Sequence, residues 1–416
     1  MILILFSKSY PYEYGGESNF LDAEVKRLVK VFERVVVVPE KREGEIFNNG
    51  LEAEVDTRYA ALLKRHNNAS IFLYGIRSPL FYSGSAEKSY PRFSLTALRR
   101  LTAFAGKAEL TRQWVEGWIR EQGVNASDCL FYTYWFDQAA AGIGLAKKQF
   151  PQLRVVSRAH GYDIYEEQYY TPPFWPCRWS VLPMMSKIFP DSQAGTDYLR
   201  ERYGHDALYE TSLLGVTDPG AVNQPSSDGT FRIISCSMIR PEKRVELLLD
   251  CLRHAAAQRP NQRFEWHHIG NGASRDELQQ AADSAFPPNA RAFFPGYADN
   301  DALMKLYREQ NFDAFINISS TEGTPVSIME AISFGIPVIA TAVGGNREIV
   351  SEENGILLSE NPTPQEVSAA VFSLLDNPQS AQNKRDGSRA VWNAKYNADA
   401  NFSEFAQRLK QIRLEP

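Results

Sequence analysis

Two glutamates with seven residues between them, Glu322 and Glu330, are the strongest candidates for chemistry in this sequence. They follow the apolar run 314–318, which is predicted to form a strand, and they flank a loop that contains glycine. A strand, such a loop and a helix N-terminus together form a site for an anion, because free N–H groups and the positive end of the helix dipole face outward. Two carboxylates beside it suit recognition of sugar hydroxyls, since each accepts several O–H hydrogen bonds.

The helix after this loop has start and stop signals of its own. Thr324 is expected to cap it, Pro325 to take its first position and Gly335 to end it. The alternative interpretation is an ordinary strand–loop–helix unit with two surface glutamates.

A second group of candidates consists of three cations, Arg240, Lys243 and Arg244, directly after the predicted strand 231–236. Cations at the carboxyl end of a strand would neutralise a diphosphate. A basic surface loop is the competing interpretation. Neither a Walker A loop nor a G-x-G-x-x-G fingerprint occurs, which disfavours NTPases and dinucleotide-dependent dehydrogenases.

Glycines and a histidine mark three further strand ends. Gly344 and Gly345 follow the predicted strand 338–341, and Gly16 lies in a pair of glycines after the first strand. Glycine lets a backbone approach a ligand closely, although each pair also fits a plain turn.

His160 ends the strand that begins at Val155, where a polar side chain tends to face the ligand crevice. A single histidine is otherwise more often structural. Neighbouring His267 and His268 point to opposite faces of a strand, and no metal site is predicted.

Composition excludes several classes of protein. Hydrophobic residues make up 44% of the chain and charged residues 23%, as in ordinary globular proteins. The 45 Lys+Arg against 50 Asp+Glu give a net charge of −5, so no nucleic acid is expected as a partner. The four cysteines form no C-x-x-C pair, which disfavours a zinc site and a disulfide framework. The first apolar run is too short for a signal peptide, and no apolar stretch has the length of a transmembrane helix. A cytoplasmic location is therefore expected.

The elements that must position these residues alternate along the whole chain. Short, largely β-branched apolar runs indicate strands covered on both faces, and amphipathic helical patterns separate them. The predicted strands are 2–6, 34–38, 70–73, 130–133, 155–157, 187–189, 231–236, 264–269, 292–294, 314–318, 338–341 and 355–358. Helices are predicted at 19–32, 244–257, 301–310 and 398–413. This alternation favours α/β architecture with two doubly wound domains.

Turn-forming residues at 215–220 mark the most favourable domain boundary. We expect one domain at 1–214 and another at 215–397. The last helical pattern, about 398–416, either caps the second domain or crosses back to the first.

Charge is unevenly distributed. The segment 61–122 holds ten Lys+Arg against four Glu, with nine aromatic residues interspersed. Such a segment suits peripheral contact with a membrane or an anionic, lipid-linked substrate. A solvated surface in front of an ordinary core is the other interpretation.

These motifs together resemble the retaining GT-B glycosyltransferases of family 4. The most specific match is the family's E-x7-E element, here Glu322-Gly-Thr-Pro-Val-Ser-Ile-Met-Glu330. Cys236-Ser-Met-Ile-Arg-Pro-Glu-Lys243, Tyr10-Pro-Tyr-Glu-Tyr-Gly-Gly-Glu17 and Arg158-Ala-His-Gly-Tyr-Asp163 resemble the family's other elements, in the right order. The resemblance implies two Rossmann-like domains that face a central cleft. It also implies an acceptor-binding N-terminal domain, a donor-binding C-terminal domain and a final helix that crosses back to the first.

The resemblance also implies roles for individual residues in binding a nucleotide-diphospho-sugar. Glu330 would hold the ribose, and Glu322 would contact the donor sugar, with the backbone of Gly323, Thr324, Pro325 and Val326 around it. Lys243 would bind the diphosphate, and Gly16 would approach it from the other domain. His160 would contact the donor sugar near its anomeric centre.

Two positions depart from the family pattern at the diphosphate. The usual arginine aligns with Met238, so Arg240, two residues on, is the expected substitute. Arg244 stands where the family has glycine.

The function implied is a retaining glycosyltransferase that moves a sugar from a UDP- or GDP-sugar to a glycan or lipid-linked oligosaccharide, in bacterial surface polysaccharide biosynthesis. No cofactor and no divalent metal are expected, because cations and a helix dipole would carry the charge of the leaving group. The alternatives are a GT-B nucleotide-sugar 2-epimerase and a non-catalytic carbohydrate-binding relative.

Overall fold

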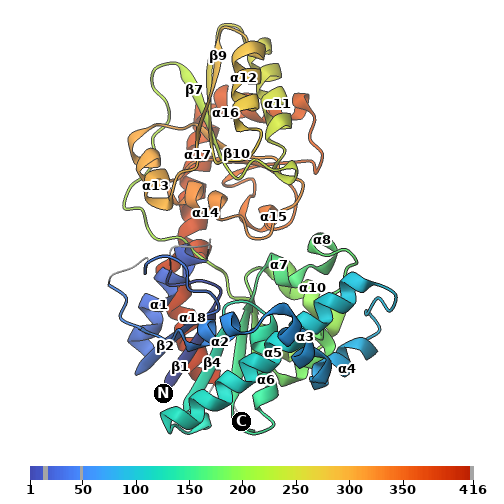
Figure 1. Cartoon of the computed structure of the whole chain (residues 1–416). Helices are drawn as coiled ribbons and strands as arrows, with labels where there is room; N and C mark the ends of the chain where they lie inside the picture. The colour runs from blue at the N-terminus through green and yellow to red at the C-terminus, as the bar shows by residue number, and fades with distance from the viewer. Residues whose placement is uncertain (13–16, 47–49, 413–416) are drawn as a thin grey trace. The chain divides into compact units, whose positions relative to one another are not determined.

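Two six-stranded parallel sheets organise the chain, as Figure 1 shows. The computed structural model describes residues 1–12, 17–46 and 50–412. The chain divides into an N-terminal unit, Met1–Leu214 with Asp399–Pro416, and a C-terminal unit, Gly215–Ala398.

The first sheet forms the centre of the N-terminal unit. β1 is paired with β2 on one side and β4 on the other, so that Ile4 lies between Val36 and Phe131. All three side chains are buried, as expected for a parallel sheet covered on both faces. In spatial order the strands are β3 (Glu54–Val55), β2 (Arg34–Pro39), β1 (Ile2–Ser7), β4 (Cys129–Thr133), β5 (Arg154–Ala159) and β6 (Lys187–Pro190).

The longest helix of this unit is α5 (Leu95–Gln122), whose N-terminus is capped by the Ser94 side chain and whose C-terminus is followed by Gly123 with φ +63°. Its Trp114 packs edge-on against Phe6 of β1, with ring centroids 5.3 Å apart. The remaining helices of the unit are α1 (Ser18–Val31), α2 (Arg58–Arg65), α3 (Asn68–Arg77), α4 (Pro79–Ala86), α6 (Gln138–Ala146), α7 (Gly161–Ile164), α8 (Glu166–Tyr169), α9 (Arg178–Val181), α10 (Gln193–Tyr203) and α18 (Ala398–Ile412).

The predicted strand at 70–73 is wrong, because these residues belong to α3. The Asn67 side chain caps this helix by accepting a hydrogen bond from the Ser70 N–H. Two glycines let α3 cross α5 closely: a Cβ on Gly75 would lie 2.1 Å from the Thr102 carbonyl oxygen, and one on Gly106 would lie 2.1 Å from that of Ile71. Packing against α5 and a helix cap thus outweigh a β-rich sequence of four residues.

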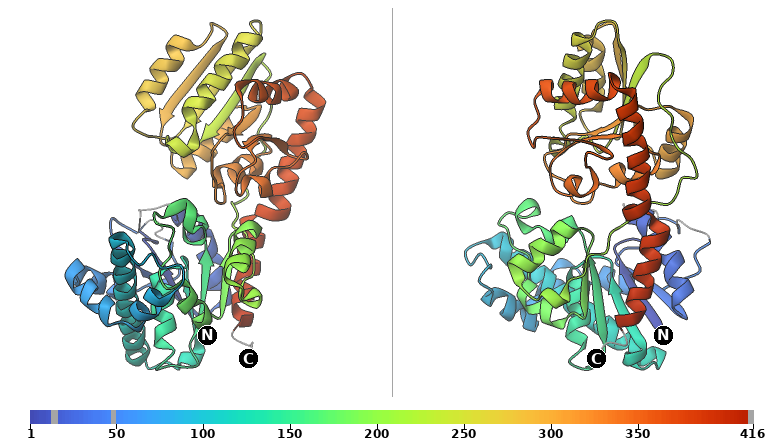
Figure 2. Two further views of the ribbon diagram at one scale, coloured as in Figure 1. Left: turned by 90° about the vertical axis from the view of Figure 1, so that its right-hand side faces the viewer. Right: turned by 180° about the vertical axis from the view of Figure 1, so that it is seen from behind.

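Helix α18 packs on the N-terminal unit although it follows the C-terminal unit in sequence. Figure 2 shows this last red helix beside the strands of the first sheet. The Phe405 ring lies 5.5 Å from that of Tyr132 and 5.1 Å from that of Phe189, and the Arg158 guanidinium lies 3.9 Å above it. Arg158 in turn pairs with Glu24 at 3.0 Å, and both side chains are fully buried.

The second sheet has the same organisation. In spatial order its strands are β12 (Gly355–Leu358), β11 (Val338–Thr341), β10 (Ala314–Asn317), β7 (Thr230–Cys236), β8 (Arg263–Ile269) and β9 (Ala290–Gly296). The helices that accompany it are α11 (Val245–Gln258), α12 (Arg275–Ala285), α13 (Asn300–Glu309), α14 (Val326–Ser333), α15 (Asn346–Ile349), α16 (Pro364–Leu375) and α17 (Pro378–Val391).

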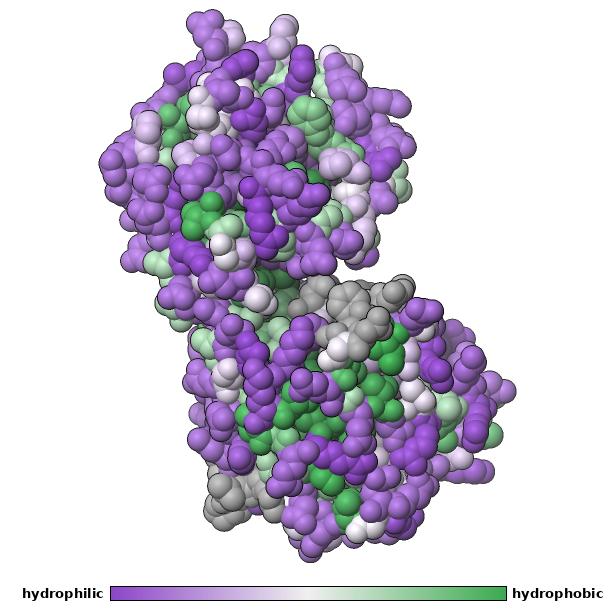
Figure 3. Space-filling model, turned by 90° about the vertical axis from the view of Figure 1, so that its left-hand side faces the viewer, coloured by the Kyte–Doolittle hydropathy of each residue, from purple (hydrophilic) through white to green (hydrophobic). Residues whose placement is uncertain are grey.

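The predicted α/β class with two doubly wound, Rossmann-like domains is confirmed, and so are the other predicted strands and the four predicted helices. In the part of the chain that the structure describes, every helix is too short or too polar to cross a lipid bilayer. On the face drawn in Figure 3, the C-terminal unit is mostly hydrophilic, whereas apolar side chains gather on the N-terminal unit.

Candidate functional site

The candidate site in the C-terminal unit lies where β7 and β10 end. These strands are neighbours and run parallel, so the segments that follow them meet at one edge of the sheet. Lys243 follows β7 in a single 3₁₀ turn, Pro241–Lys243, and Glu322 follows β10. The Lys243 Nζ lies 2.7 Å from Glu322 Oε1, which brings together two of the predicted residues.

Glu322 is held more firmly than its position in a loop suggests. Its Oε1 accepts hydrogen bonds from Lys243, from Asn317 Nδ2 at 2.9 Å and from Ser319 Oγ at 2.7 Å. The side chain is 8% exposed. These bonds fix the carboxylate and leave its Oε2 without a recorded partner among the described residues.

Two glycines after β11 support the same loop. Gly344 has φ +43°, and a Cβ there would lie 1.8 Å from the Glu322 carbonyl oxygen. The N–H of Gly345 donates to the Gly323 carbonyl at 3.0 Å. The close approach that this glycine pair permits is therefore between two protein loops.

Helix α14 begins directly after this loop, at Val326. Pro325 takes the N-cap position and no side chain caps the helix, so the prediction that Thr324 is the cap is wrong. Pro325 also has no N–H, so it cannot donate to an anion. The N–H groups of Gly323 and Val326 have no protein partner within the described residues, and they are available to a ligand. Gly335, with φ +73°, ends the helix as predicted.

Glu330 lies on α14 and is buried, with 6% of its surface exposed. Its Oε1 accepts a hydrogen bond from Asn300 Nδ2 at 2.7 Å, and no cation pairs with it in the described parts of the chain. Burial raises the pKa of Glu330 to about 7, and the bond from Asn300 opposes this shift only in part. The interpretation of both glutamates as surface residues is thus wrong. Asn300 was not predicted, since nothing in its sequence context distinguishes it.

The three predicted cations have separate environments. The side chain of Arg240 is 58% exposed, and its guanidinium lies 4.0 Å from the Glu242 carboxylate. Arg244 has φ +52°, in the left-handed region that favours glycine. Its side chain donates to the Glu360 carbonyl at 2.7 Å and to Asn361 Oδ1 at 2.8 Å. Of the three, the structure brings Lys243 alone to Glu322.

His160 lies at the carboxyl end of β5 in the N-terminal unit. Its Nδ1 is 3.0 Å from Asp191 Oδ2, and its Nε2 is 3.0 Å from the Tyr134 carbonyl oxygen. Both nitrogens face acceptors, so both donate only when the ring is an imidazolium. Burial lowers the pKa of His160, but Asp191 outweighs burial and the net shift is upward. The two acceptors around the ring and the direction of the pKa shift thus both act to stabilise the protonated form of His160 relative to an isolated histidine.

Gly16 lies outside the described residues, but Glu17 next to it does not. The Glu17 Oε1 accepts from the Tyr10 N–H at 2.9 Å, and its Oε2 accepts from Trp135 Nε1 at 2.8 Å. The Trp135 ring is 4.7 Å from that of His160. Glu17 thus connects the backbone after β1 to the surroundings of His160, a role that was not predicted from the sequence.

A network of charges at the same edge of the first sheet was not predicted. Lys8, after β1, contacts both Glu40, after β2, and Asp137, after β4. Lys107 on α5 lies 2.9 Å from the other Glu40 oxygen. Burial disfavours the charge of Glu40, but the two lysines outweigh it and lower the pKa of Glu40 to about 2. Four fixed charges of balanced sign therefore line this edge.

Comparison with known proteins connects this geometry to a family. Residues 222–390 match the family described as glycosyl transferases group 1, and this segment contains every predicted site residue of the C-terminal unit. A 144-residue stretch, 34% of this chain, is 27% identical to 27% of the GtfA subunit of a Streptococcus agalactiae UDP-N-acetylglucosamine–peptide N-acetylglucosaminyltransferase. The chain spans 27% to 30% of the length of the curated relatives it matches first.

Two solved structures resemble the whole chain. A lipopolysaccharide outer core galactosyltransferase, WaaB, matches with TM-score 0.65 and 15% identity over 99% of this chain and 100% of that one. Anabaena Alr3699/HepE, in complex with UDP and glucose, matches with TM-score 0.63 and 17% identity over the same shares of the two chains. The architecture of two Rossmann-like domains is therefore the GT-B fold of these structures.

Proposed function

We propose that this chain is a glycosyltransferase that moves a sugar from a nucleotide-diphospho-sugar to a glycan or lipid-linked oligosaccharide. The observation that carries the proposal is the set of Lys243, Glu322 and Glu330 at the sheet edge where β7 and β10 end. This set lies within the segment that matches the glycosyl transferases group 1 family. The role in bacterial surface polysaccharide biosynthesis follows from the family resemblance.

The donor is proposed to bind along the start of α14. Lys243 and the N–H groups of Gly323 and Val326 present positive charge to the diphosphate. The free Oε2 of Glu322 accepts hydroxyls of the sugar, and Glu330 accepts those of the ribose. The exposed Arg240 is free to reach the diphosphate once Glu242 releases it. UDP is the first nucleotide to test, because both the Streptococcus relative and the Anabaena structure are named with it; GDP is the second.

The reaction is proposed to proceed with retention, as in the glycosyltransferases of family 4. The bond between the sugar's anomeric carbon and the diphosphate oxygen breaks, a bond from the acceptor oxygen to that carbon forms on the same face, and the proton of the acceptor hydroxyl passes to the departing diphosphate. As the family resemblance implies, His160 would contact the donor sugar near its anomeric centre, where its polarity helps an oxocarbenium-like transition state, and Gly16 would approach the diphosphate. Because Lys243, Arg240 and a helix N-terminus would compensate the charge of the leaving diphosphate, we expect the reaction to need no divalent metal.

The acceptor is proposed to reach the N-terminal domain from a membrane surface on the cytoplasmic side. Nine of the fourteen large apolar side chains that are exposed in the described residues belong to this unit, and five of them lie between positions 72 and 95. The five are Phe72, Leu73, Tyr82, Phe93 and Leu95. Exposed Lys88, Arg92 and Arg99 accompany them. Apolar side chains next to cations are typical of surfaces that bind anionic membranes.

Calorimetric titration with UDP, GDP and ADP, each with and without Mg²⁺, tests the donor site. We expect one diphosphate to bind best, irrespective of Mg²⁺, and Glu330→Ala to lose this binding. Glu353→Ala, which removes an exposed glutamate of the same domain, is the matched control. If none of the three diphosphates binds the wild type, the proposed function is withdrawn.

Flotation with vesicles tests the membrane contact. The wild type should float with vesicles that contain phosphatidylglycerol and stay behind with pure phosphatidylcholine. Replacing Phe93 and Leu95 by serine should abolish flotation and leave nucleotide binding unchanged. If the wild type does not float with anionic vesicles, the proposed membrane contact is wrong. The proposed donor site does not depend on this result.

A further inference from the structure

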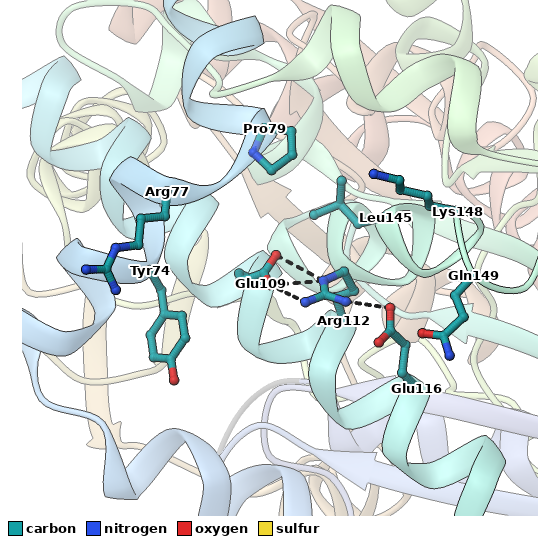
Figure 4. Close-up of a pocket in the computed structure, with 9 residues that line it drawn as sticks. All are labelled: Tyr74, Arg77, Pro79, Glu109, Arg112, Glu116, Leu145, Lys148 and Gln149. Carbon is teal, nitrogen blue, oxygen red and sulfur yellow. Dashed lines mark hydrogen bonds and ion pairs between the residues drawn. The ribbon is translucent and has the colours of Figure 1, made fainter.

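A cavity of about 660 Å³ opens on the N-terminal unit between α3, the start of α4, α5 and the end of α6 (Figure 4). Its volume is in the range of small-molecule sites. Within the N-terminal unit, the connections of the sheet place the cavity away from His160. Helix α6 leaves β4 at the carboxyl edge and runs back, so that Lys148 and Gln149 after it lie near the amino end of β5. His160 lies at the opposite end of that strand.

The floor of the cavity is an ion-pair network on α5. The Arg112 side chain is held between Glu109, whose two oxygens are 3.0 and 3.1 Å from Nε, and Glu116, whose Oε1 is 2.5 Å from Nη1. Arg120 lies 3.5 Å from the other Glu116 oxygen. Arg112 in the floor and Arg120 next to it thus balance the two glutamates.

The walls carry a surplus of positive charge. Figure 4 shows Arg77 of α3 and Lys148 on opposite sides of the Arg112 network. Both are exposed, and neither has an ion pair with any described residue. The Tyr74 ring and hydroxyl line the α3 side, and Pro79 and Leu145 add apolar surface. The Gln149 oxygen accepts from Arg120 at 2.8 Å, which leaves its NH₂ group for a ligand.

We propose that this cavity binds an anionic sugar, a sugar unit that carries a phosphate or a carboxylate. Arg77 and Lys148 supply the positive charge for the anion from two sides of the cavity, because no carboxylate of the described residues neutralises either of them. The remaining lone pairs of Glu109 and Glu116 and the amide of Gln149 serve sugar hydroxyls. The Tyr74 ring, with Pro79 and Leu145, provides the apolar surface that the C–H face of a sugar needs. This site is independent of the proposed donor site.

Isothermal titration of the full chain tests the proposal with four probes: glucose 1-phosphate, glucuronate, glucose and inorganic phosphate. UDP is present in excess, so that the donor site does not take up the phosphosugar. We expect at least one of the two anionic sugars to bind saturably, and at least tenfold more tightly than either glucose or phosphate. The tighter of the two identifies the anion.

Variants locate the binding. Arg77→Ala with Lys148→Ala should weaken it at least tenfold, whereas Lys41→Ala with Arg42→Ala, a matched loss of two exposed cations outside the cavity, should leave it unchanged. Leu145→Trp, which fills the cavity without changing charge, should also abolish binding; thermal unfolding checks that each variant is folded. The proposal is overturned if neither anionic sugar binds, if phosphate alone binds as tightly, or if the cavity variants bind like the control pair. None of these results involves nucleotide binding, so the proposed function is judged separately.

Discussion

Replacing Glu322 by glutamine should tighten the binding of a nucleoside diphosphate while it abolishes sugar transfer. Lys243 is paired with Glu322 at 2.7 Å, so a diphosphate must compete with this carboxylate for the lysine. Glutamine has the same shape, and its amide oxygen still accepts hydrogen bonds from Asn317 and Ser319, but it carries no charge and so forms no ion pair with Lys243. The variant thus frees the cation that the diphosphate needs.

The size of the effect follows from burial. The Glu322 side chain is 8% exposed and that of Lys243 is 23% exposed, so the pair lies between a surface and a fully buried ion pair. Exposed pairs contribute less than about 1 kcal/mol, and hydrogen bonds to charged groups about 1.5–3 kcal/mol. We expect the loss of this ion pair to make the binding free energy of the diphosphate more favourable by about 1–2 kcal/mol, which corresponds to roughly 5- to 30-fold tighter binding.

The assay is calorimetric titration of wild type and Glu322→Gln with the preferred diphosphate, at two salt concentrations. Because the pair is partly exposed, the gain should shrink at high salt. Adding Lys243→Met to the variant should remove the gain, while Glu353→Gln, a surface control, should not change binding. Equal or weaker binding by a folded Glu322→Gln would refute the reasoning, since it would mean that the carboxylate does not compete for Lys243.

Three further predictions concern stability. Burial raises the pKa of Glu330 from 4.5 to about 7, so the unfolded chain loses this proton at a lower pH than the folded chain does. The folding free energy of the wild type should therefore weaken by up to about 3 kcal/mol as pH rises from 4.5 to 7. Urea unfolding across that pH range should show the loss in the wild type and not in Glu330→Gln. Phe405→Ala should cost about 3–5 kcal/mol in the N-terminal unit because α18 loses its main ring contacts, and calorimetry should show a lower unfolding temperature for that unit. Arg244→Gly should change the unfolding free energy by less than about 1 kcal/mol, because glycine relieves the strain of the left-handed backbone and this offsets the lost side-chain hydrogen bonds. Arg244→Val should lower the unfolding free energy by more than about 1 kcal/mol. Urea unfolding of the wild type and both variants measures the two differences.

Most of the fold could be predicted because it depends on patterns within single segments. Buried parallel strands such as β1 and β7 are continuous apolar runs, and the polar turns around position 215 separate two series of them. The failure at 70–73 shows the limit of this reasoning. A run of four residues does not reveal whether its backbone will pair with a strand or pack on a helix, and here the glycines that admit α5 lie up to 36 positions away.

The candidate site could be predicted in its residue types but not in its contacts. Spacing and strand ends indicated Glu322, Glu330, Lys243 and His160. That Lys243 pairs with Glu322 depends on the neighbouring positions of β7 and β10, which a sequence without pairing information does not contain. The partners Asn300 and Asp191 come from other elements, and single polar residues at such distances have no recognisable pattern.

The crossing-back helix has a consequence for how the protein is made. The N-terminal unit lacks α18 until the ribosome has translated the whole of residues 215–398, so this unit cannot reach its native state during the first half of synthesis. Until then the buried Arg158 and its neighbours Tyr132 and Phe189 have no cover on the side that Phe405 takes. A truncated chain that ends after Leu214 would leave Arg158, Tyr132 and Phe189 exposed, and chaperones or proteases could bind this surface. The N-terminal unit can therefore complete its fold only after the C-terminal unit has been translated.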